Sequence, residues 1–165
     1  MSFSRSRISR LVAMAAIALS LPAFAATTPS SIAVSATVQA TCLNTATPLA
    51  FGNYTGAQAD ATATITVTCT NTTTYSVGLN AGLGTAPVAT VTTRHMNGPA
   101  TAGLAYELKS ASQTGSNWGN TAPTDTVAGT GTGSAQSITV FGRVPAGQLV
   151  TPGAYTDTIT ATVTY

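Results

Sequence analysis

Apolar and polar residues alternate with a period of two through most of this 165-residue chain, and this pattern limits its fold more than any other feature. In residues 31–42 the even positions are apolar and share one face, whereas the odd positions are small or polar. Residues 62–69 repeat the pattern, with Ile65, Val67 and Cys69 on one face and threonines on the other. Period-two alternation is typical of half-buried strands, and abundant Thr and Val favour the same structure. The sequence therefore predicts an all-β chain.

Clusters of glycine, proline, asparagine and serine divide the alternating stretches into short segments. We predict roughly seven to nine strands, a number and spacing typical of a β-sandwich. The Gly-rich residues 129–134 are predicted to form a flexible loop. The predicted strands are residues 31–42, 62–69, 75–79, 88–91, 94–97, 104–108, 137–144 and 155–165, with a short apolar piece at 49–52. One face is expected to hold Leu104, Tyr106 and Leu108 in one of these strands, and Ile159, Ala161, Val163 and Tyr165 in the last.

Residues 1–25 are predicted to be a secretory signal peptide. They combine a positively charged start, an apolar stretch at residues 11–21 and an Ala-Phe-Ala cleavage site at residues 23–25. The apolar stretch is too short to span roughly 30 Å of hydrocarbon. We therefore expect export through the periplasm, a mature chain that begins at Ala26, and no membrane insertion after the signal is removed.

Removal of the signal peptide changes the charge of the chain. Three of the six basic residues leave with it, and the remaining three face four acidic residues, so the formal net charge becomes −1. The mature chain shows no basic patch that would bind phosphates, so nucleic acid is not an expected partner. It also has no basic amphipathic segment that would favour a membrane surface.

Two cysteines, Cys42 and Cys69, remain in the mature chain. An even number of cysteines in an exported chain predicts a disulfide between them. A structural zinc site needs about four ligands, whereas this chain offers two thiols and one histidine and has no CxxC pair. We therefore expect no metal and no cofactor.

The sequence shows no arrangement typical of an enzyme, and we expect no catalytic residues. A Ser/His/Asp set would require His95, which lies in a polar segment without a nucleophile motif. The four acidic residues of the chain are scattered and form no recognisable glycosidase pair. The glycine-rich run at residues 129–133 lacks the Gly-Lys-Ser/Thr ending of a phosphate-binding loop.

The aromatic side chains allow two interpretations. They could form a sugar-binding platform, but residues scattered over strands and turns are more typical of core and rim positions, and we favour the second interpretation. The residues in question are Tyr54, Tyr75, Tyr106, Trp118 and Tyr155.

Several segments, taken in order, resemble the spore coat protein U domain family, which includes the pilins of archaic, Csu-type chaperone–usher pili. The resemblance covers nearly all of the mature chain, and its most specific part is the ending up to the terminal tyrosine. The matching segments are residues 34–42, 49–54, 65–69, 104–108, Trp118-Gly119, 138–145 and 153–165.

The resemblance implies an immunoglobulin-like β-sandwich that lacks one strand and is completed by a donor strand from a neighbouring subunit. It divides the mature chain into a donor-strand extension at residues 26–41 and a pilin domain at residues 42–165. It also implies three partners: a periplasmic chaperone that first fills the open groove, an outer-membrane usher, and identical or related pilin subunits. The expected function is a structural subunit of a surface pilus, with roles in adhesion and biofilm formation.

Within the extension, one apolar row fits the donor role, because alternate side chains of an added strand enter pockets of the acceptor. The expected donor residues are Ile32, Val34, Ala36, Val38 and Ala40. The sequence leaves open whether this segment pairs within its own chain or with another chain.

Two other functions are compatible with the sequence. A secreted coat or matrix protein is one alternative, and a free carbohydrate-binding β-sandwich that pairs its first strand within its own sheet is another. A tip adhesin would normally carry an additional receptor domain, so we expect a shaft or minor subunit.

Overall fold

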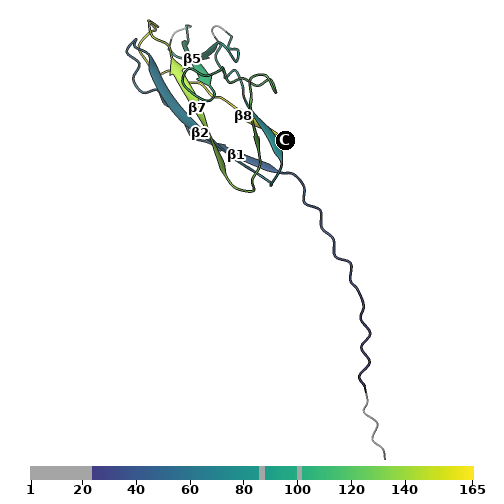
Figure 1. Cartoon of the computed structure of the whole chain (residues 1–165). Helices are drawn as coiled ribbons and strands as arrows, with labels where there is room; N and C mark the ends of the chain where they lie inside the picture. Colours follow the sequence, from purple (N-terminus) through teal and green to yellow (C-terminus); the bar gives the residue numbers. More distant parts are fainter. Residues whose placement is uncertain (1–23, 86–87, 100–101) are drawn as a thin grey trace, which may run out of the picture. The chain divides into compact units, whose positions relative to one another are not determined.

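The computed structural model describes residues 24–85, 88–99 and 102–165, and the chain divides into two units, residues 1–36 and 37–165 (Figure 1). In the first unit, the described residues 24–36 are exposed and form no strand. The predicted signal peptide lies outside the described residues except for residues 24 and 25.

The second unit contains all of the described strands. The described residues of this chain include no helix that is long and apolar enough to cross a membrane. The strands are β1 (Cys42–Ala46), β2 (Ala59–Cys69), β3 (Thr74–Leu79), β4 (Arg94–Met96), β5 (Leu104–Lys109), β6 (Val127–Thr130), β7 (Gln136–Val144) and β8 (Ala161–Thr164).

The eight strands form an immunoglobulin-like β-sandwich of two antiparallel sheets. One sheet has the order β1-β2-β7-β5-β4, and the other has the order β6-β3-β8. The longest pairing joins β2 and β7, which lie side by side from Ala59 opposite Val144 to Val67 opposite Gln136 (Figure 1). This register places the apolar residues of both strands on one face, because side chains alternate along a strand. The predicted all-β sandwich is confirmed.

Four predicted strands, at residues 62–69, 75–79, 104–108 and 137–144, coincide with β2, β3, β5 and β7. Their predicted inward faces are also correct: Ile65, Val67 and Cys69 are buried, as are Leu104, Tyr106 and Leu108. The periodic pattern works here because each of these strands has one face on the core.

The structure differs from the sequence-based expectation in several places. The predicted strand at residues 88–91 is not formed, because Val88 and Thr90 make only isolated bridges, with Thr85 and Thr93. Residues 31–40 form no strand, although their alternation is the cleanest in the chain, because they pair with no other described residue. The predicted loop at 129–134 begins inside β6, since Gly129 and Thr130 pair with β3. The last predicted strand is reduced to β8, and Tyr165 is exposed because it follows the last paired residue.

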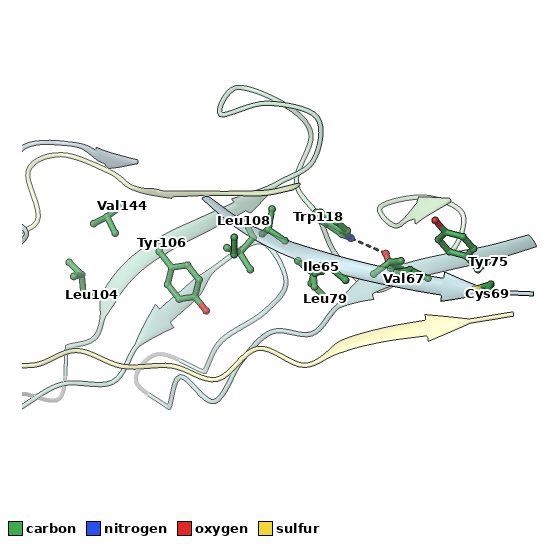
Figure 2. Packing of buried hydrophobic residues seen from close by; sticks show 13 residues of the cluster. Ile65, Val67, Cys69, Tyr75, Leu79, Leu104, Tyr106, Leu108, Trp118 and Val144 are labelled. Atoms are coloured by element: carbon green, nitrogen blue, oxygen red, sulfur yellow. Dashed lines mark hydrogen bonds between the residues drawn. The ribbon is translucent and has the colours of Figure 1, made fainter. Parts of the chain in front are cut away.

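The core lies between the two sheets and is built from the inward faces of their strands. Trp118 is fully buried beyond the end of β5, where its indole Nε1 donates a hydrogen bond to the Val77 carbonyl at 2.9 Å (Figure 2). The buried apolar residues are Ala63, Ile65, Val67, Cys69, Tyr75, Val77, Leu79, Leu104, Tyr106, Leu108, Trp118, Val140 and Val144.

Candidate functional site

A groove of about 410 Å³ opens between two segments that belong to neither sheet along most of their length. The first wall contains Ala46, the last residue of β1, and residues 47–49 and 51, which follow it. The second wall contains residues 155–159, which lead into β8, and Ala161, the first residue of β8. The apolar side chains Leu49, Phe51 and Ile159 of these walls are only half-buried. The groove therefore leaves part of the apolar interior open to solvent.

The floor of the groove is the core of the sandwich. Strands β2, β3, β4, β5 and β7 all contribute side chains to it, so an occupant would contact both sheets. The floor residues are Ala63, Ile65, Leu79, Met96, Tyr106, Leu108 and Val140.

The two ends of the groove differ. At the β1 end, Asn44 Nδ2 donates a hydrogen bond to the Ala161 carbonyl at 3.2 Å and links β1 to the start of β8. At the other end the groove joins a second cavity of about 780 Å³, which shares Leu49, Phe51 and Tyr155 with it. One end of the groove is thus bridged by a hydrogen bond, and the other is continuous with the second cavity; we call them the closed end and the open end.

Glycine in β7 allows the first wall to lie over the floor. A Cβ atom at Gly142 would lie 2.8 Å from Leu49 Cδ1 and 2.9 Å from Phe51 Cζ, so any side chain there would displace both. The Phe51 ring also packs on Tyr106, with ring centroids 6.2 Å apart and planes tilted by 57°. The apolar piece predicted at residues 49–52 is therefore a groove wall rather than a strand.

The second wall is fixed by polar contacts. Tyr106, in the floor, donates a hydrogen bond from its hydroxyl to Asp157 Oδ2 at 2.6 Å. Figure 2 shows this hydroxyl directed toward the C-terminal segment, which is drawn in yellow. Burial raises the pKa of Tyr106, and the hydrogen bond and charge of Asp157 raise it further, so the hydroxyl remains a donor at physiological pH.

Arg94 is the residue near the groove that sequence analysis missed. It is 1 % exposed, and its guanidinium donates hydrogen bonds to four backbone carbonyls. Burial lowers the pKa of Arg94, and the negative charges of Asp157 and Asp125 oppose this shift. A basic residue in a polar segment carries no sequence signal for such burial. The accepting carbonyls are those of Leu79, Asn80, Val91 and Trp118.

The predicted donor residues are all exposed. Ile32, Val34 and Val38 are 86 %, 90 % and 86 % exposed, and Ala36 and Ala40 are exposed as well. Among the described residues, backbone pairing begins at Thr41, whose carbonyl accepts a hydrogen bond from the Thr70 amide at 3.0 Å. The donor role of the five residues stays a prediction.

The predicted disulfide between Cys42 and Cys69 is present. The two residues lie directly opposite each other in β1 and β2, so the bond joins the edge strand to the longest strand of its sheet. It also fixes β1 just before the first wall of the groove begins.

The remaining candidate residues are not brought together into a chemical site. His95 lies in β4, and no group of three or more potential metal ligands occurs in the described part of the chain. The aromatic residues occupy core and rim positions, as expected: Tyr75, Tyr106 and Trp118 are buried, whereas Tyr54 and Tyr155 are half-buried.

Comparison with known proteins gives three results. The chain resembles a crystal structure of the CsuC–CsuE chaperone–tip adhesion subunit pre-assembly complex from archaic chaperone–usher Csu pili of Acinetobacter baumannii, with a TM-score of 0.58 and 23 % sequence identity. The match covers 78 % of this chain and 40 % of that chain, and it shows a common fold. No curated protein sequence matches. The Spore Coat Protein U domain matches residues 28–162, which is most of the sequence, and the chain therefore belongs to the Spore Coat Protein U domain family.

Proposed function

We propose that this chain is a structural subunit of a bacterial surface pilus that is assembled by chaperone–usher donor-strand exchange. The observation that carries the proposal is the groove between residues 46–51 and 155–161, which opens the core of the sandwich to solvent. The exposed apolar row of the N-terminal extension is the second support, because groove and row are each incomplete alone. An unpaired edge beside open apolar surface is an aggregation hazard unless another strand covers it.

Strand addition explains both features physically. In β-augmentation, backbone hydrogen bonds join the added strand to the edge, and every second side chain enters a pocket. Ile32, Val34 and Val38 supply most of the apolar surface of the row, and burial of each would contribute roughly 1.5–3 kcal/mol. The walls are half-buried in the unoccupied groove, so an added strand would complete the burial of Leu49 and Ile159 as well.

The shape of the groove favours one direction of insertion. The chain enters the domain at Cys42, near the end that Asn44 closes, and the groove opens at the opposite end. A donor strand antiparallel to β8 would place Ile32 toward the closed end and Ala40 at the open end. The body of the next subunit would then stand at the open end of the groove. Repetition of this arrangement gives a linear head-to-tail fibre.

The proposed partners are identical or related subunits, a periplasmic chaperone that covers the groove before assembly, and an outer-membrane usher. The similar structure is a pre-assembly complex of a chaperone and a tip adhesion subunit of Csu pili, and this supports the chaperone in particular. Export to the cell surface follows from the same pathway, and the proposed roles of the fibre are adhesion and biofilm formation. We place this chain in the shaft or among the minor subunits.

A donor-complemented variant tests the proposal. A second copy of residues 30–41 is fused after Tyr165 through a short glycine-containing linker, which allows it to run antiparallel to β8. The fused chain is expected to be a monomer that unfolds cooperatively and does not require a chaperone, whereas the wild-type mature chain is expected to polymerise or to need its chaperone. Size-exclusion chromatography and thermal unfolding measure this difference, and a fusion with Val34→Asp in the added copy is the control.

A stable wild-type monomer without a chaperone, together with no fibres on the producing cells in electron micrographs, would contradict the proposal. That result would favour a free carbohydrate-binding sandwich. Fibres or layers that form without any chaperone or usher would instead favour a secreted coat or matrix protein.

A further inference from the structure

The second wall of the groove crosses from one sheet to the other. Thr156 pairs with Asn97, just beyond β4, through backbone hydrogen bonds of 2.8 and 2.9 Å. Five residues later, Ala161 pairs with Leu79 of β3 in the opposite sheet. The intervening residues 157–160 therefore lie between the pairing with Asn97 in one sheet and the pairing with β3 in the other.

Side-chain oxygens, rather than a regular ladder, hold this crossing. Asp157 Oδ1 accepts hydrogen bonds from the amides of Leu83 at 2.6 Å and Thr158 at 2.7 Å, while Asp157 Oδ2 accepts from the Tyr106 hydroxyl. Asn80 Oδ1 accepts a further hydrogen bond from the Thr160 amide at 2.9 Å. Hydrogen bonds to a carboxylate are shorter and stronger than those between neutral groups, so Asp157 is the strongest of these anchors.

The neighbouring residues are shaped for the Asp157 carboxylate. Gly82 has φ +85°, and a Cβ atom built there would collide with the carboxylate, so a larger residue could not occupy this position beside Asp157. Tyr106 is 5 % exposed in the floor, and its hydroxyl finds a partner in Asp157. The floor, the wall and the loop at residues 82–83 are thus joined through one side chain.

This anchoring leaves the groove edge of the wall unpaired. The Asn80 amide donates to the Thr160 carbonyl at 3.2 Å, so Thr160 directs its backbone polar groups toward β3. In an antiparallel strand the next residue directs its groups to the opposite side. Ile159 lines the groove, and its amide and carbonyl make no hydrogen bond with any described residue, so they are available on the groove side if the alternation holds here.

We propose that Tyr106 and Asp157 are positioning residues for strand capture: they hold the crossing so that the Ile159 edge is ready to pair with an incoming donor strand. This inference depends on the strand-exchange function proposed above. Neither residue needs to touch the donor backbone, because both act through the wall. Their loss is expected to slow donor capture more than it reduces the stability of the domain.

The matched variants are Tyr106→Phe and Tyr75→Phe. Both tyrosines are 5 % exposed in the core, but Tyr75 does not line the groove, and its hydroxyl contacts Gln136 at 3.4 Å. Full-length mature chain, purified with its co-expressed chaperone, is mixed with a dye-labelled synthetic peptide of residues 30–41. Fluorescence anisotropy gives the rate and Kd of peptide capture, and urea unfolding of the same complexes gives their stability.

We expect Tyr106→Phe to slow peptide capture about tenfold, the effect of one hydrogen bond to a charged group, and Tyr75→Phe to leave capture unchanged. Asp157→Asn keeps a side-chain oxygen that can accept from the amides of Leu83 and Thr158. Its rate of peptide capture is therefore expected to lie between those of wild type and Tyr106→Phe. It also provides the test if Tyr106→Phe does not fold. Equal capture by all variants, or losses in Tyr75→Phe as large as those in Tyr106→Phe, would overturn the positioning role. Failure of the wild-type complex to capture any peptide would instead contradict the strand-exchange function.

Discussion

Arg94 and Tyr106 are polar residues that the fold buries close to the groove, and each is satisfied in a different way. The Arg94 guanidinium donates only to backbone carbonyls, whereas the Tyr106 hydroxyl donates to a carboxylate. A buried polar group without partners costs about 1–3 kcal/mol, so these contacts determine which conformations of the surrounding segments are allowed. Leu79 and Asn80, which accept from Arg94, are the residues that lie beside the second wall.

The disulfide gives a first prediction at this scale. Replacement of Cys42 and Cys69 by Ser is expected to lower the free energy of unfolding by about 2–5 kcal/mol, because the unfolded chain is no longer cross-linked. Urea unfolding of the donor-complemented variant measures the loss.

Peptide mapping without reductant should recover the Cys42–Cys69 linkage and no free thiol from surface material. Two free thiols there would contradict both the pairing and the oxidising compartment.

Tyr106 gives a second prediction, on pH dependence. Its pKa is raised in the folded chain above the ordinary value of 10.0, first by burial and then by Asp157. Above pH 10 the unfolded chain releases this proton while the folded chain keeps it, so stability is complete below pH 10 and falls as the pH rises through it. The loss approaches about 1.4 kcal/mol per pH unit. Urea unfolding of the donor-complemented variant at pH 8 and pH 11 should show a larger loss for wild type than for Tyr106→Phe. Equal losses in the two proteins would contradict this assignment.

At the scale of elements, the proposed donor row is matched to the groove through the period of an extended strand. Alternate residues of an extended strand stand about 6.6–6.8 Å apart on one face, and all five donor residues lie on one such face. The groove has an apolar floor along its length, drawn from strands of both sheets. The odd positions of the donor, which are small or polar, would face solvent. The threonines of β2 are directed outward in the same way.

The third prediction separates these two faces of the donor. Val34→Asp would bury an unpaired carboxylate in the groove of the neighbour, at a cost of several kcal/mol, roughly 2–5. Fibres should disappear in electron micrographs, while the subunit is still exported and still bound by its chaperone, because its own groove is unchanged. Ser35→Asp places the same charge on the outward face and is expected to have a much smaller effect.

Two other outcomes would contradict this assignment of the donor. If Val34→Asp unfolded the subunit itself, the segment would pair within its own chain. If Val34→Asp and Ser35→Asp reduced fibres equally, the apolar row would not enter a groove at all.

At the scale of the whole molecule, very little charge is available to keep copies apart. Without the predicted signal peptide, the chain would carry a formal net charge of −1. Arg143 binds Asp60 through two hydrogen bonds of 2.8 and 3.0 Å and lowers its pKa, Lys109 lies 3.2 Å from Glu107, and Arg94 is buried. Low net charge promotes association, and the open groove adds exposed apolar surface. On the proposed function, we therefore expect the subunit to need a partner from export until assembly.

Export gives the fourth prediction. Cleavage after Ala25 should produce a mature chain that begins at Ala26, because residues 23–25 form the only well-placed small-x-small site. Mass spectrometry of the exported protein measures its N-terminus. Detection of residues 1–25 in the exported protein would contradict the signal-peptide assignment.

The sequence by itself determined the fold class, the disulfide and the inward faces of the principal strands. Alternation in β2 and β5 is a local property of the sequence. It matches the observed burial because each of these strands has one face on the core and the other toward solvent. With only two cysteines, Cys42 and Cys69 had a single possible partner within the chain. The sequence also suggested the donor row, whose role stays a prediction.

Only the tertiary structure decided where the sandwich is open. The alternation of residues 31–41 gives no information about a pairing partner, since strand pairing depends on a neighbour and not on the strand alone. The walls of the groove are short, irregular segments, and they are positioned by contacts between residues far apart in sequence. Gly142 admits Leu49, and Tyr106 binds Asp157 across 51 residues. No periodic pattern encodes such long-range contacts, so the groove became visible only in the folded chain.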